Sequence, residues 1–171
     1  IYRGDTADVL FSPDINEFRG IKSVQLLVKD VRVCGRTLKE RCAMIAEYDR
    51  IISNRSSMID ESFVPLRSDF KNVYLYIRRE LRLCGDAPVN IYQIMKNTVG
   101  ESVLAYVRLR FIIDILVQTG IVSFYGDPDY STDGGNLPLT VNNVEVKVDL
   151  KASEIYQSLL TRIRGHNRAD I

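Results

Sequence analysis

Residues 16–31, NEFRGIKSVQLLVKDV, decide the fold at the start of the chain. Gly20 favours a turn, and residues 23–32 partly alternate apolar and polar side chains, which indicates a half-buried strand. A short apolar run at 7–11 precedes them and is broken by Ser12-Pro13-Asp14. We therefore predict two antiparallel strands joined by a turn at Gly20. Two strands with a half-exposed face are not stable alone in water, so this segment needs further strands or support from the rest of the chain.

Downstream, apolar residues follow helical spacing, with strand-like runs between the helices. Helices are predicted over residues 37–53, 68–83, 90–96, 101–118 and 152–164. Ser68 suits the N-cap of the second of these. Strands are predicted at 121–125 and as a hairpin of 137–141 with 144–148 across Asn142-Asn143. The stretch 54–66 is predicted to be a linker.

The order of helix, short helix, turn, longer helix, strand, loop and strand after residue 67 resembles a winged helix. Such a likeness in fold does not establish DNA binding. This part of the chain is expected to share one mixed core, formed by Phe70, Tyr74, Leu104, Phe111, Ile115, Val122 and Leu159.

The composition is that of an ordinary globular protein. The chain has 171 residues, 46% of them hydrophobic, and a formal net charge of +1. A binding site for nucleic acid must therefore be a local patch rather than an overall basic charge. No membrane-length apolar run or signal pattern is present, so we expect a soluble, cytoplasmic protein. Because the sequence begins with Ile1, we expect it to be a piece of a longer protein.

Several kinds of chemistry are disfavoured by the residues themselves. The one histidine, His166, lies in a polar tail, which argues against a catalytic triad. The three cysteines lack metal-ligand spacing and are expected to be reduced thiols. Asp127, Asp129 and Asp133 share one loop, but this loop lacks the glycine and the terminal glutamate of a calcium site. No metal or cofactor is expected in these residues.

A family resemblance enters at residues 16–20 and 24–31. They are similar to the end of the OB-fold in bacterial RecJ nucleases, where an N-E-aromatic-x-G stretch precedes a strand of the type Q-L-x-[V/I]-x-D. Residues 8–11 resemble the strand before it. Residues 65–74 resemble the R-x-D-F-x-x-[V/F]-Y element that opens the extra C-terminal domain of many RecJ proteins, and residues 146–156 resemble the end of that domain.

The resemblance implies an α+β fold in three parts. Residues 1–36 would be the last strands of an OB-type barrel, 37–66 a connecting helix and linker, and 67–171 a winged-helix-like domain. The family's catalytic site lies in a DHH-type phosphoesterase domain, where histidines and aspartates hold two divalent ions, Mn²⁺ or Mg²⁺. That motif needs two adjacent histidines, and this chain has one. We therefore expect no nuclease activity from these residues.

The function implied is that of an accessory region of a single-stranded-DNA 5′–3′ exonuclease acting in DNA repair and recombination. OB-type grooves hold single strands with cations along the backbone and aromatic rings against the bases. The candidate DNA-binding residues are Asn16, Phe18, Arg19, Lys22 and Gln25. The alternative reading is that these residues form a turn, a core position and a solvated surface.

A second function remains open, in which the C-terminal domain docks a protein partner such as single-strand-binding protein. Two sets of arginines could contact a phosphate or an acidic protein tail. They are Arg78, Arg79 and Arg82 in the helix over 68–83, and Arg108 and Arg110 in the helix over 101–118. A solvated helix face is the common alternative for such residues.

Overall fold

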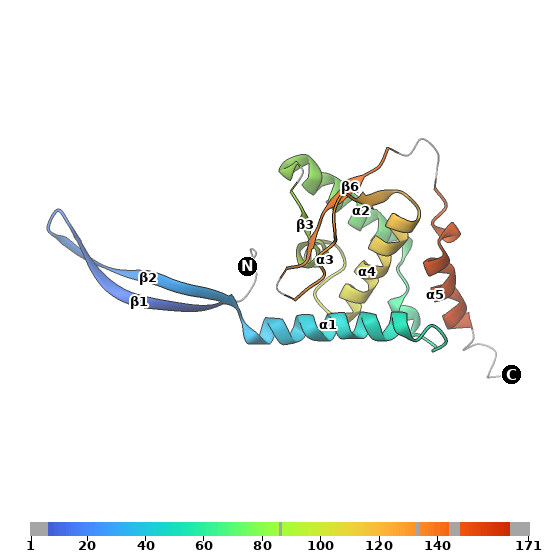
Figure 1. Cartoon of the computed structure of the whole chain (residues 1–171), viewed down its shortest axis with the longest axis horizontal. Helices are drawn as coiled ribbons and strands as arrows, with labels where there is room; N and C mark the ends of the chain where they lie inside the picture. Colours follow the sequence, from blue (N-terminus) through green and yellow to red (C-terminus); the bar gives the residue numbers. More distant parts are fainter. Residues whose placement is uncertain (1–6, 86, 133, 144–147, 165–171) are drawn as a thin grey trace. The chain divides into compact units, whose positions relative to one another are not determined.

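The computed structural model describes residues 7–85, 87–132, 134–143 and 148–164 (Figure 1). In this part of the chain the fold is mixed α+β, as expected. The chain divides into two compact units, residues 1–41 and 42–171. The boundary falls within helix α1 (Gly35–Ser53). Each unit is considered separately below.

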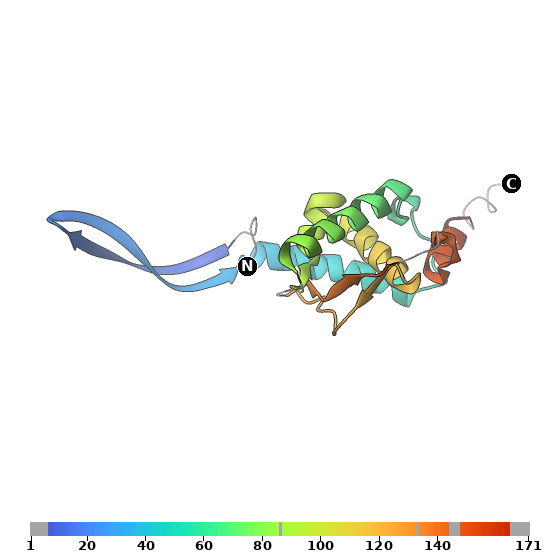
Figure 2. The same cartoon turned by 90° about the horizontal axis from the view of Figure 1, so that it is seen from above.

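The first unit contains a long antiparallel hairpin of β1 (Ala7–Phe18) and β2 (Ile21–Val33). Its two strands twist about each other in both views (Figures 1 and 2). The connecting residues Arg19 and Gly20 have φ values of +53° and +75°. Positive φ at both central residues belongs to the tight turn whose twist matches that of the strands. The predicted turn at Gly20 is confirmed.

The predicted break at Ser12-Pro13-Asp14 is wrong, because β1 runs through these residues and its register shifts between Leu10 and Phe11 instead. A two-stranded ribbon leaves one edge of each strand unpaired. Proline, which lacks an N–H group, is tolerated on such an edge. Asn16 and Phe18 are likewise strand residues rather than part of a connector.

The second unit is mainly helical. The N-cap side chains explain where two of its helices begin: Asn90 accepts from the Tyr92 N–H at 3.0 Å and Ser102 from the Ala105 N–H at 3.0 Å. Ser68 is not the N-cap of α2, because the helix begins after Leu66, whose N–H donates to Asp69 at 2.9 Å. The remaining elements of the unit are α2 (Arg67–Cys84), α3 (Ile91–Thr98), α4 (Val103–Gln118), α5 (Glu154–Arg164) and the 3₁₀ turns η1 (Glu61–Phe63) and η2 (Leu150–Ala152).

Two short antiparallel sheets accompany these helices. One pairs β3 (Val89–Asn90) with β5 (Asn136–Leu137), and the other pairs β4 (Val122–Phe124) with β6 (Leu139–Val141). The first strand of the hairpin predicted across Asn142-Asn143 is divided between β5 and β6, and β6 pairs with β4. Its expected second strand, residues 144–148, lies mostly outside the described residues.

Helix α4 lies at the centre of the second unit and contacts η1, α2, α3, α5 and β4. Most of its side chains are buried, so it resembles a core helix rather than an amphipathic one. Of the expected core, Tyr74 and Leu104 are only half-buried. Its buried members are Phe70, Phe111, Ile115, Val122 and Leu159.

The stretch after the domain boundary belongs to this core. Met44, Tyr48 and Ile51 of α1 and Val64 beyond it are all buried there. The expected separate connector at 37–66 is thus divided, and its larger part, from Cys42 onward, packs with the C-terminal unit.

Candidate functional site

The hairpin places the five candidate DNA-binding residues on two faces. Side chains alternate between faces along a strand, and Phe18 pairs with Ile21, Asn16 with Ser23 and Asp14 with Gln25. Asn16, Phe18 and Gln25 therefore share one face, which we call the polar face, and the Gln25 amide donates to Asp14 at 3.2 Å. This face also carries Ser12, Ile21, Ser23 and Leu27. Lys22 pairs with Glu17 on the opposite face.

Arg19 lies in the turn between the strands. Its guanidinium carbon is 5.2 Å from the centre of the Phe18 ring, within cation–π range. The Phe18 ring is 67% exposed, so its other side is open to solvent. Lys22 and Glu17 form an exposed ion pair at 3.7 Å, which contributes little stability and leaves the ammonium accessible.

The opposite face is apolar and uncovered. Phe11, Ile15, Val24, Leu26 and Val28 follow one another there, and Val24 is 75% exposed. Uncovered apolar residues in such a continuous row mark a surface for another part of a protein. Within the first unit, no described element covers this row.

The two candidate arginines of α4 have partners inside the fold. Arg108 donates to the Ser62 carbonyl and lies 3.8 Å from the Asp69 carboxylate. The Arg110 guanidinium lies between two rings, 4.2 Å from the centre of Tyr48 and 3.4 Å from that of Tyr130. Both side chains therefore make contacts inside the fold that hold α4 in place.

The cluster around Arg110 also contains a buried carboxyl group. The Tyr48 hydroxyl donates to Asp114. Burial raises the pKa of Asp114, although the hydrogen bond from Tyr48 and the charge of Arg110 act in the opposite direction. Burial, followed by the nearby Asp114, also raises the pKa of Tyr48. These contacts join α1 to α4 within the second unit, and we assign them a structural role.

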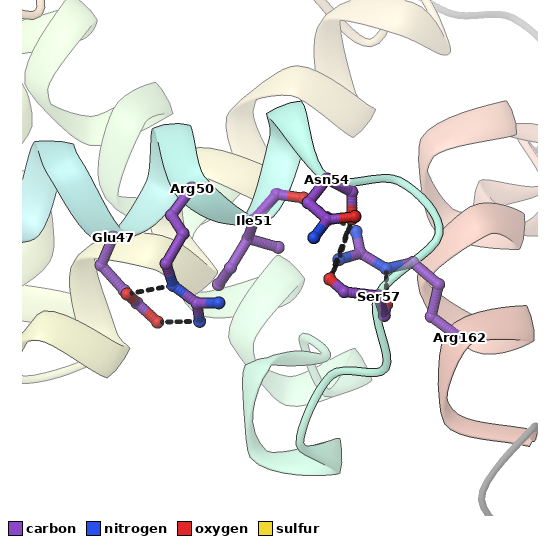
Figure 3. A network of polar contacts seen from close by, with 6 residues as sticks. All are labelled: Glu47, Arg50, Ile51, Asn54, Ser57 and Arg162. Atoms are coloured by element: carbon purple, nitrogen blue, oxygen red, sulfur yellow. Dashed lines mark hydrogen bonds and ion pairs between the residues drawn. The ribbon is translucent and has the colours of Figure 1, made fainter.

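Arg162 of α5 forms a second structural centre, at the end of α1 (Figure 3). It donates to the carbonyls of Ser57 at 2.7 Å and of Ile51 and Asn54 at 3.0 Å. The last carbonyls of a helix have no partner within the helix, and Arg162 satisfies one of them, that of Ile51, from another element. A lone arginine near the end of a helix gives no sequence signal for this role.

Helix α2 presents a basic groove that the sequence showed only in part. Arg78 and Arg82 line a hollow of about 650 Å³, whereas Arg79 pairs with Glu80 at 3.1 Å. A second hollow, of about 690 Å³, lies beside Arg67, Lys71 and Tyr74. Spacing of three or four residues along a helix could have indicated that these side chains share a face.

Within the described ranges, no three histidine, cysteine, aspartate or glutamate residues gather as metal ligands would. No helix in the same ranges is long and apolar enough to cross a membrane. No protein-family model, curated protein or solved structure matches the chain.

Proposed function

We propose that this chain is a non-catalytic, nucleic-acid-binding accessory region of a RecJ-like single-stranded-DNA 5′–3′ exonuclease, acting in DNA repair and recombination in the cytoplasm. In this proposal β1 and β2 are the last strands of an OB-type barrel, and residues 67–171 are a winged-helix-like domain. The order α2, β3, α3, α4, β4, β5, β6 supports the second assignment. A catalytic domain outside these residues would hold Mn²⁺ or Mg²⁺.

The observation that carries the proposal is the two-sided hairpin. Its apolar face, with Val24 and Leu26, needs to be covered, as the inner face of a barrel strand is. Its polar face and tip offer an aromatic ring, a guanidinium and two amides. Those are the groups with which OB-type surfaces hold a single strand.

The backbone at Arg19 adds a second line of support. A residue with a side chain in the left-handed region costs roughly 1–2 kcal/mol, and asparagine or glycine would suit this turn better. Arg19 is the one non-glycine residue with positive φ in the described part of the chain. An observed backbone outlier of this kind motivates a functional hypothesis, namely that the guanidinium is kept for its charge.

The test is Arg19→Asn in the exonuclease that contains this region. Because asparagine tolerates the positive φ of this turn, a loss of binding would not result from a changed backbone conformation. We expect weaker affinity for single-stranded DNA, a slope of log affinity against log salt reduced by about 0.7, and unchanged turnover at saturating DNA.

Lys22→Ala is the matched control, because it removes the same charge from the opposite face of the hairpin tip. It should weaken binding less than Arg19→Asn. Unchanged affinity and slope in a folded Arg19→Asn variant would contradict the proposal. In the alternative function, the second unit docks single-strand-binding protein. Binding measurements on variants of α2 separate this function from DNA binding.

A further inference from the structure

Along one side of α2 runs a row of residues that the hairpin proposal does not use. Arg67, Lys71, Tyr74, Arg78 and Arg82 follow one another at intervals of four, three, four and four residues, so they lie on one helix face. At a rise of 1.5 Å per residue, the row is about 22 Å long. We call these five residues the α2 row.

The α2 row borders three hollows that join into one groove. The hollow at Arg78 and Arg82 shares Tyr74, Ile121 and Val148 with the middle hollow. The middle hollow shares Arg67 and Phe70 with a third, of about 500 Å³, where Lys151 and Tyr156 lie. The groove therefore follows the helix over the whole length of the row.

The charge of this groove is strongly positive. Its described lining includes one carboxylate, Asp149, against five cationic side chains, and Asp149 already accepts from the Lys151 N–H at 3.0 Å. In the described residues, no carboxylate is paired with any cation of the α2 row. The cationic side chains are Arg67, Lys71, Arg78, Arg82 and Lys151.

Tyr74 lies in the middle of the row. It is half-buried, lines two of the hollows and is not part of the hydrophobic core described above. A ring in this position offers a surface on which a base can stack. Asn142 and Asn143 add polar groups to the rim near Arg78.

We propose that the α2 groove binds the backbone of single-stranded nucleic acid, with Lys71, Arg78 and Arg82 against phosphates and Tyr74 against a base. The length of the row favours an extended polyanion over a single anionic group. Open cationic grooves with an aromatic platform hold single strands without reading sequence. This inference shares its ligand class with the proposed function, but it concerns a separate surface in the second unit.

The experiment uses the whole 171-residue chain and a fluorescently labelled oligothymidylate, with anisotropy measured over a salt series. Arg78→Ala with Arg82→Ala should weaken binding at least tenfold. It should also lower the slope of log affinity against log salt by about 1.4, for two lost phosphate contacts on a single strand. Circular dichroism and thermal unfolding check that the variant is folded.

Arg79→Ala is the matched control. It removes the same charge from the same helix, but Arg79 lies over the Tyr76 ring at 5.0 Å and lines none of the three hollows. Its affinity and slope should stay close to those of the unchanged chain. For Tyr74, leucine should reduce affinity about fivefold or more, while phenylalanine, which keeps the ring, should not.

Other results would overturn the inference. Because Arg79→Ala removes one charge and the double variant removes two, a loss of affinity and slope for Arg79→Ala of half that of the double variant or more would mean diffuse attraction rather than a groove. No oligothymidylate binding, with tight binding of an acidic peptide that ends in an apolar residue, would assign the groove to protein docking. Arg19→Asn in the same assay separates the two surfaces. If only Arg19→Asn lowers the affinity, the hairpin binds nucleic acid and the groove does not. If only the substitutions in the α2 row lower it, the groove binds nucleic acid and the hairpin does not.

Discussion

The side chain of Arg162 stabilises the second unit. Its guanidinium binds the Ile51 carbonyl in the last turn of α1 and the carbonyls of Asn54 and Ser57 in the segment that follows, in a geometry that a planar group with several donors can satisfy. Burial, and then the charge of Arg50, lowers the pKa of Arg162, so the carbonyls are needed to balance a desolvated charge. The residue therefore stabilises a helix end to which it is not adjacent in sequence.

Arg162→Met should lower the free energy of unfolding by roughly 3 kcal/mol, because one buried and two part-buried carbonyls lose a charged donor. Arg162→Lys should recover only part of this, since an ammonium cannot reproduce the planar fork. The measurement is urea unfolding. The control Arg50→Ala removes an exposed arginine that pairs with Glu47 and should change stability little. A loss for Arg162→Met no larger than for Arg50→Ala would contradict this role.

Asp114 makes stability depend on pH. Its pKa in the folded chain is raised above the ordinary value of 3.8, mainly by burial. A carboxyl group with a raised folded pKa favours folding below the unfolded pKa, and this contribution is lost as pH rises through the folded pKa. Asp114→Asn removes the titration and keeps an acceptor for Tyr48. Its stability relative to the unchanged chain should therefore rise with pH above about 4. A pH-independent difference would contradict the assignment.

At the scale of elements, α4 organises the second unit. Phe111 is fully buried and its ring lies 5.4 Å from that of Tyr48. Phe111→Ala should lower the free energy of unfolding by roughly 3–5 kcal/mol, for lost burial and the cavity left behind. Leu83→Ala, at a 73% exposed position on α2, should change it by less than about 0.5 kcal/mol. A change below about 1 kcal/mol for Phe111→Ala would show that its placement is wrong.

The sequence predicted individual helices and the turn better than it predicted which strands pair with each other. Helices and the turn at Gly20 follow from local spacing and from glycine's freedom at positive φ. The pairing of β6 with β4 could not be foreseen, because the turn signal adjacent to β6 is Asn142-Asn143 and β4 lies about fifteen residues upstream of β6. The same limit hid the core character of α4: Arg108 and Arg110 appear polar in sequence, and only tertiary contacts show their partners.

Only part of the candidate site could be predicted from the sequence, because the sequence does not show tertiary contacts. Arg78 and Arg82 were identified by residue type alone, whereas Arg67, Lys71 and Tyr74 become part of a site through the hollows beside them. For the hairpin, the right residue types were chosen, but strand alternation then separates Lys22 from Asn16, Phe18 and Gln25.

At the scale of the whole molecule, we predict no nuclease activity from this chain with Mg²⁺ or Mn²⁺. Metal-dependent phosphodiester hydrolysis needs ligands that hold the ions, and the sequence offers a single histidine. The assay is release of nucleotides from labelled single-stranded DNA. Release that is abolished by a point substitution within these residues would overturn the prediction and the accessory role with it.

Binding of single-stranded nucleic acid through local cationic surfaces is the function that we propose for this chain. It is tested most directly by the affinity of the unmodified chain for a labelled oligothymidylate as salt is raised. We predict measurable binding at low salt, a log affinity that falls linearly with log salt, and similar affinity for a mixed-sequence single strand. No binding at low salt, or an affinity independent of salt, would contradict it.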